Sequence, residues 1–189
     1  MTASKTLNIA LVGNPNSGKS TLFNSLTGLN QKVGNFPGVT VDKKTGKVEL
    51  DTQTTANIID LPGSYSLYPR RSDEWVAYKV LMQADEDVKA DIILLVADAS
   101  NLKRNLLFCS QILDLKVPVV IALTMNDMAA KKGIKIDIGG LEAELGIPVI
   151  EVNPRKSKGL QQLKKIILLT AKQKQKSNRD FIDNKKISE

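Results

Sequence analysis

Histidine is absent from these 189 residues, there is a single cysteine, and aromatic residues make up only 4% of the chain. Without histidine, catalysis and metal binding by imidazole are excluded. One cysteine cannot form an internal disulfide, and because Cys109 lies in the apolar stretch 106–109, we expect a small core residue rather than a redox site. Aliphatic side chains must therefore build most of the core.

Long hydrophobic runs are also absent. No stretch approaches the roughly 20 apolar residues of a membrane-spanning helix. The short apolar stretch near the N-terminus runs directly into a glycine-rich loop, so it predicts a core strand rather than a signal peptide. We expect a soluble fragment, since 42% apolar and 25% charged residues are typical of one globular domain.

Positive charge is in excess, with a net charge of +7. Residues 171–189 hold six basic and three acidic side chains, a net charge of +3. A basic tail can bind nucleic acid or anionic lipid, but a solvated helix end or a linker is the commoner cause. Because no aromatic residues are interleaved with the basic residues of the body as a base-stacking platform requires, we expect no nucleic-acid partner.

Apolar runs alternate with helical patterns along the chain. Strands are predicted over residues 6–12, 45–50, 54–60, 91–97, 117–123 and 147–152, and helices over 19–29, 72–83, 102–116, 140–145 and 160–172. This order predicts an α/β fold with right-handed crossovers, a mostly parallel six-stranded sheet with one antiparallel edge strand, and helices on both faces. Residues 30–42 lack periodicity, and we expect a long functional loop there.

The most specific motif is G-x-x-x-x-G-K-[ST], which residues 13–20 match as GNPNSGKS between a predicted strand and a predicted helix. Glycines let backbone N–H groups converge on phosphate, and the helix presents its positive end to the anion. Lys19 is expected to reach the β- and γ-phosphates, and Ser20 to place its hydroxyl on Mg²⁺. The residues expected to contact nucleotide here are Gly13, Asn14, Pro15, Asn16, Ser17, Gly18, Lys19, Ser20 and Thr21.

Two further stretches can serve the phosphates. Asp60 begins the sequence DLPG at the end of a predicted strand, where it can hold Mg²⁺ through water while Gly63 turns its N–H toward a γ-phosphate. Thr40, late in the long loop, can close on Mg²⁺ when a γ-phosphate is present, although a plain strand threonine is the alternative. The predicted contacts are Gly38, Val39, Thr40, Asp60, Leu61, Pro62 and Gly63, with Thr40 and Asp60 joining Ser20 on Mg²⁺.

The sequence TMND (124–127) follows the predicted strand 117–123 and is expected to contact the nucleotide base. The Asp127 carboxylate can accept hydrogen bonds from the N1–H and the amino group of guanine. Adenine offers no such pair, which argues against an ATP-using protein. A helix N-cap is the alternative role for Asp127.

Together these motifs resemble a translation-factor-related GTP-binding domain. The stretches VGNFPGVTV (33–41), SYSL (64–67) and SDE (72–74) are similar to the FeoB family, the bacterial ferrous iron transport protein B, and the resemblance runs from about Leu7 to Leu169. It implies a P-loop NTPase of the Ras-like G-domain type, here residues 1–171, that hydrolyses GTP slowly with Mg²⁺. It also implies a regulatory role at the cytoplasmic face of the bacterial inner membrane, with residues 172–189 a basic linker or the start of a helical region that leads to the membrane transporter.

The resemblance assigns roles to further residues. Asn16 stands where FeoB-like domains place an asparagine that ligates K⁺, and such a cation offsets transition-state charge as an arginine finger does. Ser64 stands where Ras-like enzymes carry a water-orienting glutamine, so we expect the loop backbone, Ser64 or Tyr65 to hold the water. The residues expected to act in catalysis are Lys19, Thr40, Gly63 and Ser64.

Two positions depart from the family pattern. The base motif, usually N-K-x-D or N-M-x-D, begins with Thr124, which offers less than an amide, while Met125 can pack on the base. The fifth motif, usually S-A-K/R-like, reads Asn153, Pro154 and Arg155, and proline lacks the N–H that normally meets guanine O6. Either the Arg155 N–H takes over or the contact is lost, so we expect weak binding and reduced discrimination among purine nucleotides.

A different function remains open at this point. A free-standing GTPase that binds RNA during ribosome assembly would explain the basic charge and a similar phosphate loop, but the chain carries no recognisable RNA-binding module. Salt-dependent binding of the tail to RNA would favour that alternative. On the FeoB interpretation, no iron ligands are expected in these residues.

Overall fold

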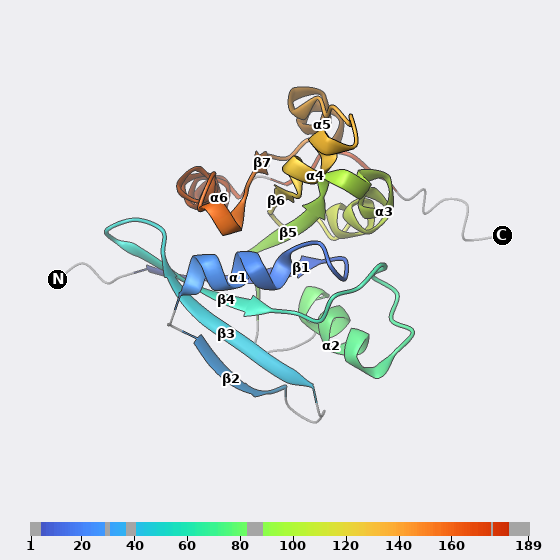
Figure 1. Cartoon of the computed structure of the whole chain (residues 1–189). Helices are drawn as coiled ribbons and strands as arrows, with labels where there is room; N and C mark the ends of the chain where they lie inside the picture. The colour runs from blue at the N-terminus through green and yellow to red at the C-terminus, as the bar shows by residue number, and fades with distance from the viewer. Residues whose placement is uncertain (1–4, 29–30, 37–40, 83–88, 175, 182–189) are drawn as a thin grey trace.

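A seven-stranded sheet forms the centre of the molecule in the computed structural model, which describes residues 5–28, 31–36, 41–82, 89–174 and 176–181 (Figure 1). The strands are β1 (Lys5–Gly13), β2 (Gln31–Asn35), β3 (Asp42–Glu49), β4 (Thr54–Asp60), β5 (Ile92–Asp98), β6 (Val119–Thr124) and β7 (Val149–Glu151). The helices are α1 (Lys19–Thr27), α2 (Ser72–Leu81), α3 (Leu102–Leu113), α4 (Asn126–Lys131), α5 (Ile138–Leu145) and α6 (Leu160–Gln173), with short 3-10 helices η1 (Ala99–Asn101) and η2 (Pro154–Lys156).

The parallel strands are buried on both faces, as their continuous apolar sequences require. Leu7, Ile9 and Leu11 of β1 join a core with α1 and α6, whereas Ala10 and Val12 of the same strand join a second core with α2 and α3. Successive side chains of a strand point to opposite faces, so one apolar run supplies both cores. The predicted α/β class with helices on both faces is confirmed.

The sheet has seven strands in the order β2-β3-β4-β1-β5-β6-β7, not six. The missed strand, β2, lies inside the predicted loop 30–42 and pairs antiparallel with β3, from Gln31 opposite Gly46 to Asn35 opposite Asp42. All five residues of β2 are exposed, so no hydrophobic alternation marks the strand in the sequence. The antiparallel strand β3 is consequently one place in from the edge, and β2 is the edge.

Several element ends differ from the prediction for local reasons. Helix α1 stops at Thr27 because Gly28 leaves the helical region with φ 56°. Helix α5 begins at Ile138, since the Asp137 carboxylate caps it by accepting from the Gly140 N–H at 3.0 Å. Helix α4 is absent from the prediction, because a helix of six residues is too short to show a periodic apolar pattern. The predicted end of α2 at Gln83 lies outside the described residues.

The described part of the basic tail lies against the domain. Ser177 is buried and donates its hydroxyl proton to the Leu145 carbonyl at 2.8 Å. Lys116, after α3, forms an ion pair with Asp180 at 2.7 Å and donates to the Arg179 carbonyl at 2.6 Å. The chain therefore leaves α6 and crosses the ends of α5 and α3.

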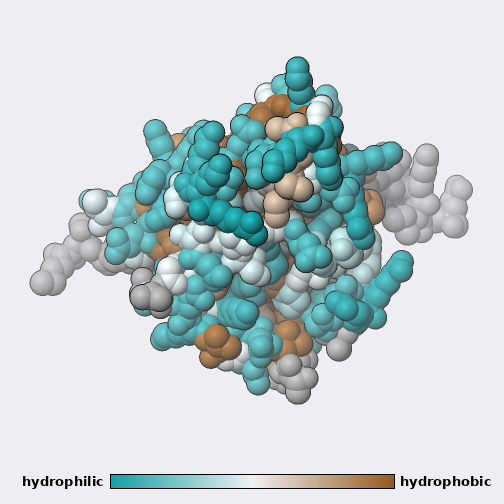
Figure 2. Space-filling model, in the orientation of Figure 1, coloured by the Kyte–Doolittle hydropathy of each residue, from teal (hydrophilic) through white to brown (hydrophobic). Residues whose placement is uncertain are grey.

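Cys109 is a small core residue, as expected, because it is buried in α3. Burial raises the pKa of its thiol to about 12, which keeps the side chain protonated near neutral pH. The face in Figure 2 is mostly hydrophilic, with hydrophobic residues in small separate spots. Within the described ranges, no helix combines the length and the apolar character needed to cross a membrane.

Candidate functional site

The loop between β1 and α1 has the backbone geometry of a tight cradle. Gly18 caps α1 in the left-handed conformation with φ 87°, which favours glycine. A Cβ added at Gly13 would lie 2.7 Å from the Val96 carbonyl oxygen on the neighbouring strand β5, so only glycine fits. Asn16 is exposed with φ 64°, a region that asparagine tolerates better than most residues. The loop is therefore held in one shape by core packing.

Two buried polar groups of this loop have no partner among the described residues. They are the Asn14 amide nitrogen and the Ser17 hydroxyl, in residues that are 4% and 1% exposed. A buried polar group without a hydrogen bond costs about 1–3 kcal/mol, so such groups usually meet a ligand or water. This donor set fits an anion in the cradle.

Lys19 and Asp60 meet beside the cradle as a nearly buried ion pair, with side chains 11% and 9% exposed. The parallel pairing of β1 with β4 sets Asp60 opposite Leu11, which brings the end of β4 next to the phosphate loop. The structure thus joins the residue predicted to bind phosphate with one predicted to hold Mg²⁺. Ser20 is exposed in the first turn of α1, and Thr21 is half-buried.

The DLPG sequence turns across the phosphate loop. A Cβ added at Gly63 would lie 3.3 Å from the backbone nitrogen of Pro15, and the Ser64 N–H donates to the Gly13 carbonyl at 3.2 Å. Leu61 is fully buried and Pro62 half-buried, so both act as packing residues here.

Both side chains predicted to hold water contact the protein, Ser64 through its hydroxyl and Tyr65 through its ring. Ser64 is 4% exposed and donates its one hydroxyl proton to the Ser66 carbonyl at 2.6 Å. The Tyr65 ring lies 4.0 Å from the Arg104 guanidinium of α3. Gly38, Val39 and Thr40 lie outside the described residues.

Thr124 faces the phosphate loop rather than an open base pocket. It is 1% exposed, and its hydroxyl lies 2.6 Å from the Ser17 carbonyl and 3.0 Å from the Ala97 carbonyl. Since a hydroxyl has one proton, it donates to either carbonyl and ties the end of β6 to the phosphate loop. The threonine hydroxyl is thus committed to the protein.

Asp127 lies in the first turn of α4, and Met125 rather than Asp127 is the N-cap. The exposed Asp127 carboxylate makes no hydrogen bond or ion pair with any other described residue. Met125 adopts φ 56°, and its Cε would lie 3.6 Å from a Cβ added at Gly18. The exposed Asp127 carboxylate thus follows, by two positions, a residue that lies against the phosphate loop.

Residues 153–155 form the start of η2, also close to α1. The Asn153 side chain caps η2 by accepting from the Lys156 N–H at 3.2 Å. The Pro154 carbonyl accepts from the Ser25 hydroxyl of α1 at 3.1 Å. Arg155 is exposed, and its N–H is in the first turn, where no intrahelical partner exists.

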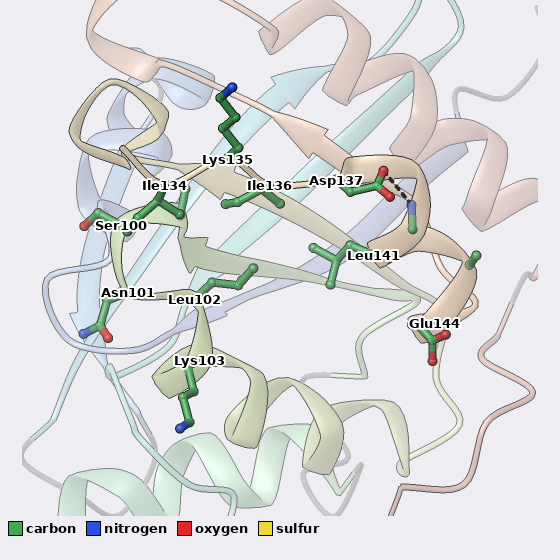
Figure 3. Close-up of a pocket in the computed structure, with 13 residues that line it drawn as sticks. Ser100, Asn101, Leu102, Lys103, Ile134, Lys135, Ile136, Asp137, Leu141 and Glu144 are labelled. Atoms are coloured by element: carbon green, nitrogen blue, oxygen red, sulfur yellow. Dashed lines mark hydrogen bonds between the residues drawn. The ribbon is translucent and has the colours of Figure 1, made fainter. Parts of the chain in front are cut away.

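A separate cavity of about 760 Å³ lies between the start of α3 and the segment from residue 134 into α5 (Figure 3). Leu102, Ile136 and Leu141 supply much of its apolar lining. The residues predicted to bind nucleotide are not part of its lining. This cavity is therefore distinct from the phosphate loop.

Comparison with known proteins decides the family. The family model described as ferrous iron transport protein B matches residues 7–167. The chain belongs to the FeoB family. The "Fe(2+) transporter FeoB" of Leptospira biflexa serovar Patoc is 47% identical over 163 residues, covering 86% of this chain and 23% of that protein. Its counterpart from Escherichia coli K12 is 46% identical over 164 residues, covering 85% of this chain and 21% of that protein.

Solved FeoB structures share the fold. The G domain of the T. maritima FeoB iron transporter has a TM-score of 0.80 and 42% identity, covering 88% of this chain and 99% of that one. A mutant S. thermophilus NFeoB bound to GDP has a TM-score of 0.79 and 44% identity, covering 88% of this chain and 63% of that one. This chain corresponds to the G domain of FeoB, and it spans about a fifth of the length of the curated FeoB relatives. The predicted resemblance to the FeoB family is confirmed.

Sequence reasoning missed two residues that shape this FeoB site. Ser25 links α1 to the loop at Pro154, and nothing in its sequence context indicates that contact. Gln111 is 8% exposed in α3 and binds the segment after DLPG. A polar residue on the same helical face as the buried Phe108 and next to the buried Ile112 was the available signal for Gln111.

Proposed function

We propose that this FeoB domain binds Mg²⁺–GTP, hydrolyses it slowly with the assistance of K⁺, and acts as a switch that regulates a membrane Fe²⁺ transporter. The observation that carries the proposal is the Lys19–Asp60 pair beside the glycine cradle. It brings together a phosphate-binding cation and a metal-binding carboxylate that neutralise each other until a charged ligand replaces each partner.

Each residue has a distinct task in this proposal. Lys19 would bind the β- and γ-phosphates in place of its ion pair with Asp60, and Asp60, Ser20 and Thr40 would hold Mg²⁺. Bound Mg²⁺ supplies neutralisation of charge on the phosphate oxygens. The N–H groups of the phosphate loop and of Gly63 donate to the charge that develops in the transition state.

Hydrolysis needs one more positive charge where Ras-like enzymes use an arginine finger. Asn16 supports the assignment of K⁺ to this place, because its exposed amide makes no hydrogen bond with another described residue. An amide oxygen is a hard ligand, suited to an alkali cation. Because the Ser64 hydroxyl already donates to the Ser66 carbonyl, and Ser64 stands where Ras-like enzymes carry a glutamine, slow intrinsic turnover is expected.

The wider role rests on the relatives. Proteins of which this chain covers 23% and 21% are named Fe(2+) transporter FeoB. We assign residues 1–171 to the GTP-binding domain and the basic residues 172–189 to a connection toward a helical and membrane-embedded region of the same protein. The domain would then work at the cytoplasmic face of the inner membrane.

The decisive experiment measures GTP hydrolysis in KCl and in NaCl at equal ionic strength. K⁺ is expected to accelerate turnover, and Asn16→Ala to abolish that acceleration while GDP still binds. The matched control is Asn178→Ala, a change of another exposed asparagine far along the chain. Equal rates in the two salts would refute the K⁺ assignment, and an absence of hydrolysis in both would refute the GTPase assignment.

A further inference from the structure

The segment that follows DLPG, residues 64–68, lies against one face of α3. Arg104, Phe108 and Gln111 are spaced i, i+4 and i+7 on that helix and so share a face. Phe108 is buried in the core, Arg104 stacks on Tyr65, and Gln111 points its amide at the segment. The segment therefore packs on this face of α3.

Gln111 makes the polar contacts between this face of α3 and the segment. Its Oε1 atom accepts a hydrogen bond from the Leu67 N–H at 2.7 Å and another from the Ser66 hydroxyl at 3.1 Å. Gln111 is 8% exposed, and a buried amide is costly unless it is hydrogen-bonded. A single acceptor atom therefore holds two successive residues of the segment.

The other end of the segment is fixed to the phosphate loop. Ser64 donates its N–H to the Gly13 carbonyl at 3.2 Å, and Gly63 packs against Pro15. Between the two anchors the Ser64 hydroxyl bridges to the Ser66 carbonyl at 2.6 Å. The chain from Gly63 to Leu67 is thus held at both ends, by the phosphate loop and by α3.

We propose that Gln111 is a positioning residue for GTP hydrolysis, which holds the Gly63 N–H beside the phosphate loop by anchoring Ser66 and Leu67. The inference rests on the proposed GTPase function. Gly63 serves the γ-phosphate, which GDP lacks. Loss of the Gln111 anchor therefore weakens turnover and the response to GTP, while GDP binding remains.

The test compares two substitutions at this position. Gln111→Met keeps the length and lacks a strong acceptor, whereas Gln111→Glu keeps an acceptor oxygen and loses the amide donor. Because both observed bonds use Oε1 as acceptor, kcat is expected to fall about tenfold in Gln111→Met and by less than about twofold in Gln111→Glu. Gln162→Met, on the exposed side of α6, is the matched control.

Trp75 gives a second readout that does not depend on hydrolysis. It is the single tryptophan of the chain and is 50% exposed in α2. Its ring lies edge-on to the ring of Tyr78, with 5.5 Å between the ring centroids. In the wild type, addition of the GTP analogue GTPγS is expected to change its fluorescence more than GDP does. In Gln111→Met that difference is expected to shrink to less than half, with GDP affinity close to the wild-type value.

The outcomes separate this inference from the proposed function. Unchanged kcat and unchanged Trp75 response in Gln111→Met would overturn the positioning role, as would an equal loss of GDP affinity, which indicates a general structural defect. Loss of turnover in Gln111→Glu equal to that in Gln111→Met would also overturn it. A wild type without GTP hydrolysis would refute the proposed GTPase instead, and the Trp75 measurement would still decide the anchor.

Discussion

The two ends of the proposed nucleotide site are built differently. At the phosphate end the shape comes from main chain packed into the core, because a Cβ at Gly13 would strike the Val96 carbonyl, and Ser17 and Asp60 are buried. At the base end, Asp127 and Arg155 are exposed side chains on short helices. In the proposed site, phosphate binding would therefore depend on the packing of the core, whereas base recognition could change without disturbing the core.

The departures from the family pattern agree with this difference. Both Thr124 and Pro154 lie at the proposed base end, and each makes a hydrogen bond with a residue that is distant in the sequence. Thr124 bonds to the Ser17 carbonyl at 2.6 Å, and the Pro154 carbonyl accepts from Ser25 at 3.1 Å. Thr124 is also the residue that connects the two ends, so it is the place to test how independent they are.

The largest effect is expected at the phosphate end. Lys19→Ala removes the cation that pairs with Asp60 and is proposed to bind the phosphates. Since hydrogen bonds to charged groups contribute about 1.5–3 kcal/mol each, affinity for GTP is expected to fall about a hundredfold. Equilibrium titration with a fluorescent GTP analogue measures the loss, with Lys165→Ala on the exposed side of α6 as the control. A loss smaller than about fivefold would mean that the cradle backbone dominates phosphate binding.

A smaller effect, confined to the base, is expected from Asp127→Asn. The carboxylate has no described protein partner, so its removal leaves the fold intact. GTP affinity is expected to fall about tenfold, while affinity for ITP, which lacks the 2-amino group, falls less. Competition titrations with the two nucleotides check this, and Glu151→Gln serves as the control. Equal wild-type affinities for GTP and ITP would show instead that Asp127 has already lost its contact with the amino group.

The smallest effect is expected from Thr124→Val, which removes the hydrogen bond between the end of β6 and the phosphate loop. The substitution keeps the shape and removes the hydroxyl that bonds to Ser17. Unfolding free energy is expected to fall by about 1 kcal/mol and GDP affinity by about fivefold. Urea unfolding and GDP titration measure these changes against Thr52→Val, an exposed control. A loss of base selectivity with unchanged affinity would instead assign Thr124 to the base.

Sequence reasoning reached the phosphate end more completely than the rest. GNPNSGKS and DLPG are local patterns with steric causes, and the structure brings Lys19 of the first to Asp60 of the second. The edge strand β2 escaped because its exposed side chains carry no periodic signal and its pairing with β3 is made by backbone. The role of Gln111 escaped because its partners Ser66 and Leu67 are more than forty positions earlier in the chain.

By itself, the sequence determined the strand–helix order apart from β2 and α4, the phosphate loop and the family, because these depend on short-range periodicity and on glycines at fixed spacing. Only the tertiary structure decided what the polar side chains do. It places the Thr124 hydroxyl at the Ser17 carbonyl and the Ser64 hydroxyl at the Ser66 carbonyl. It also pairs Lys19 with Asp60 and directs the Gln111 amide oxygen to the segment after DLPG. The physical reason is that a buried polar group must find a partner wherever the packed chain supplies one, and that partner is set by the approach of distant elements.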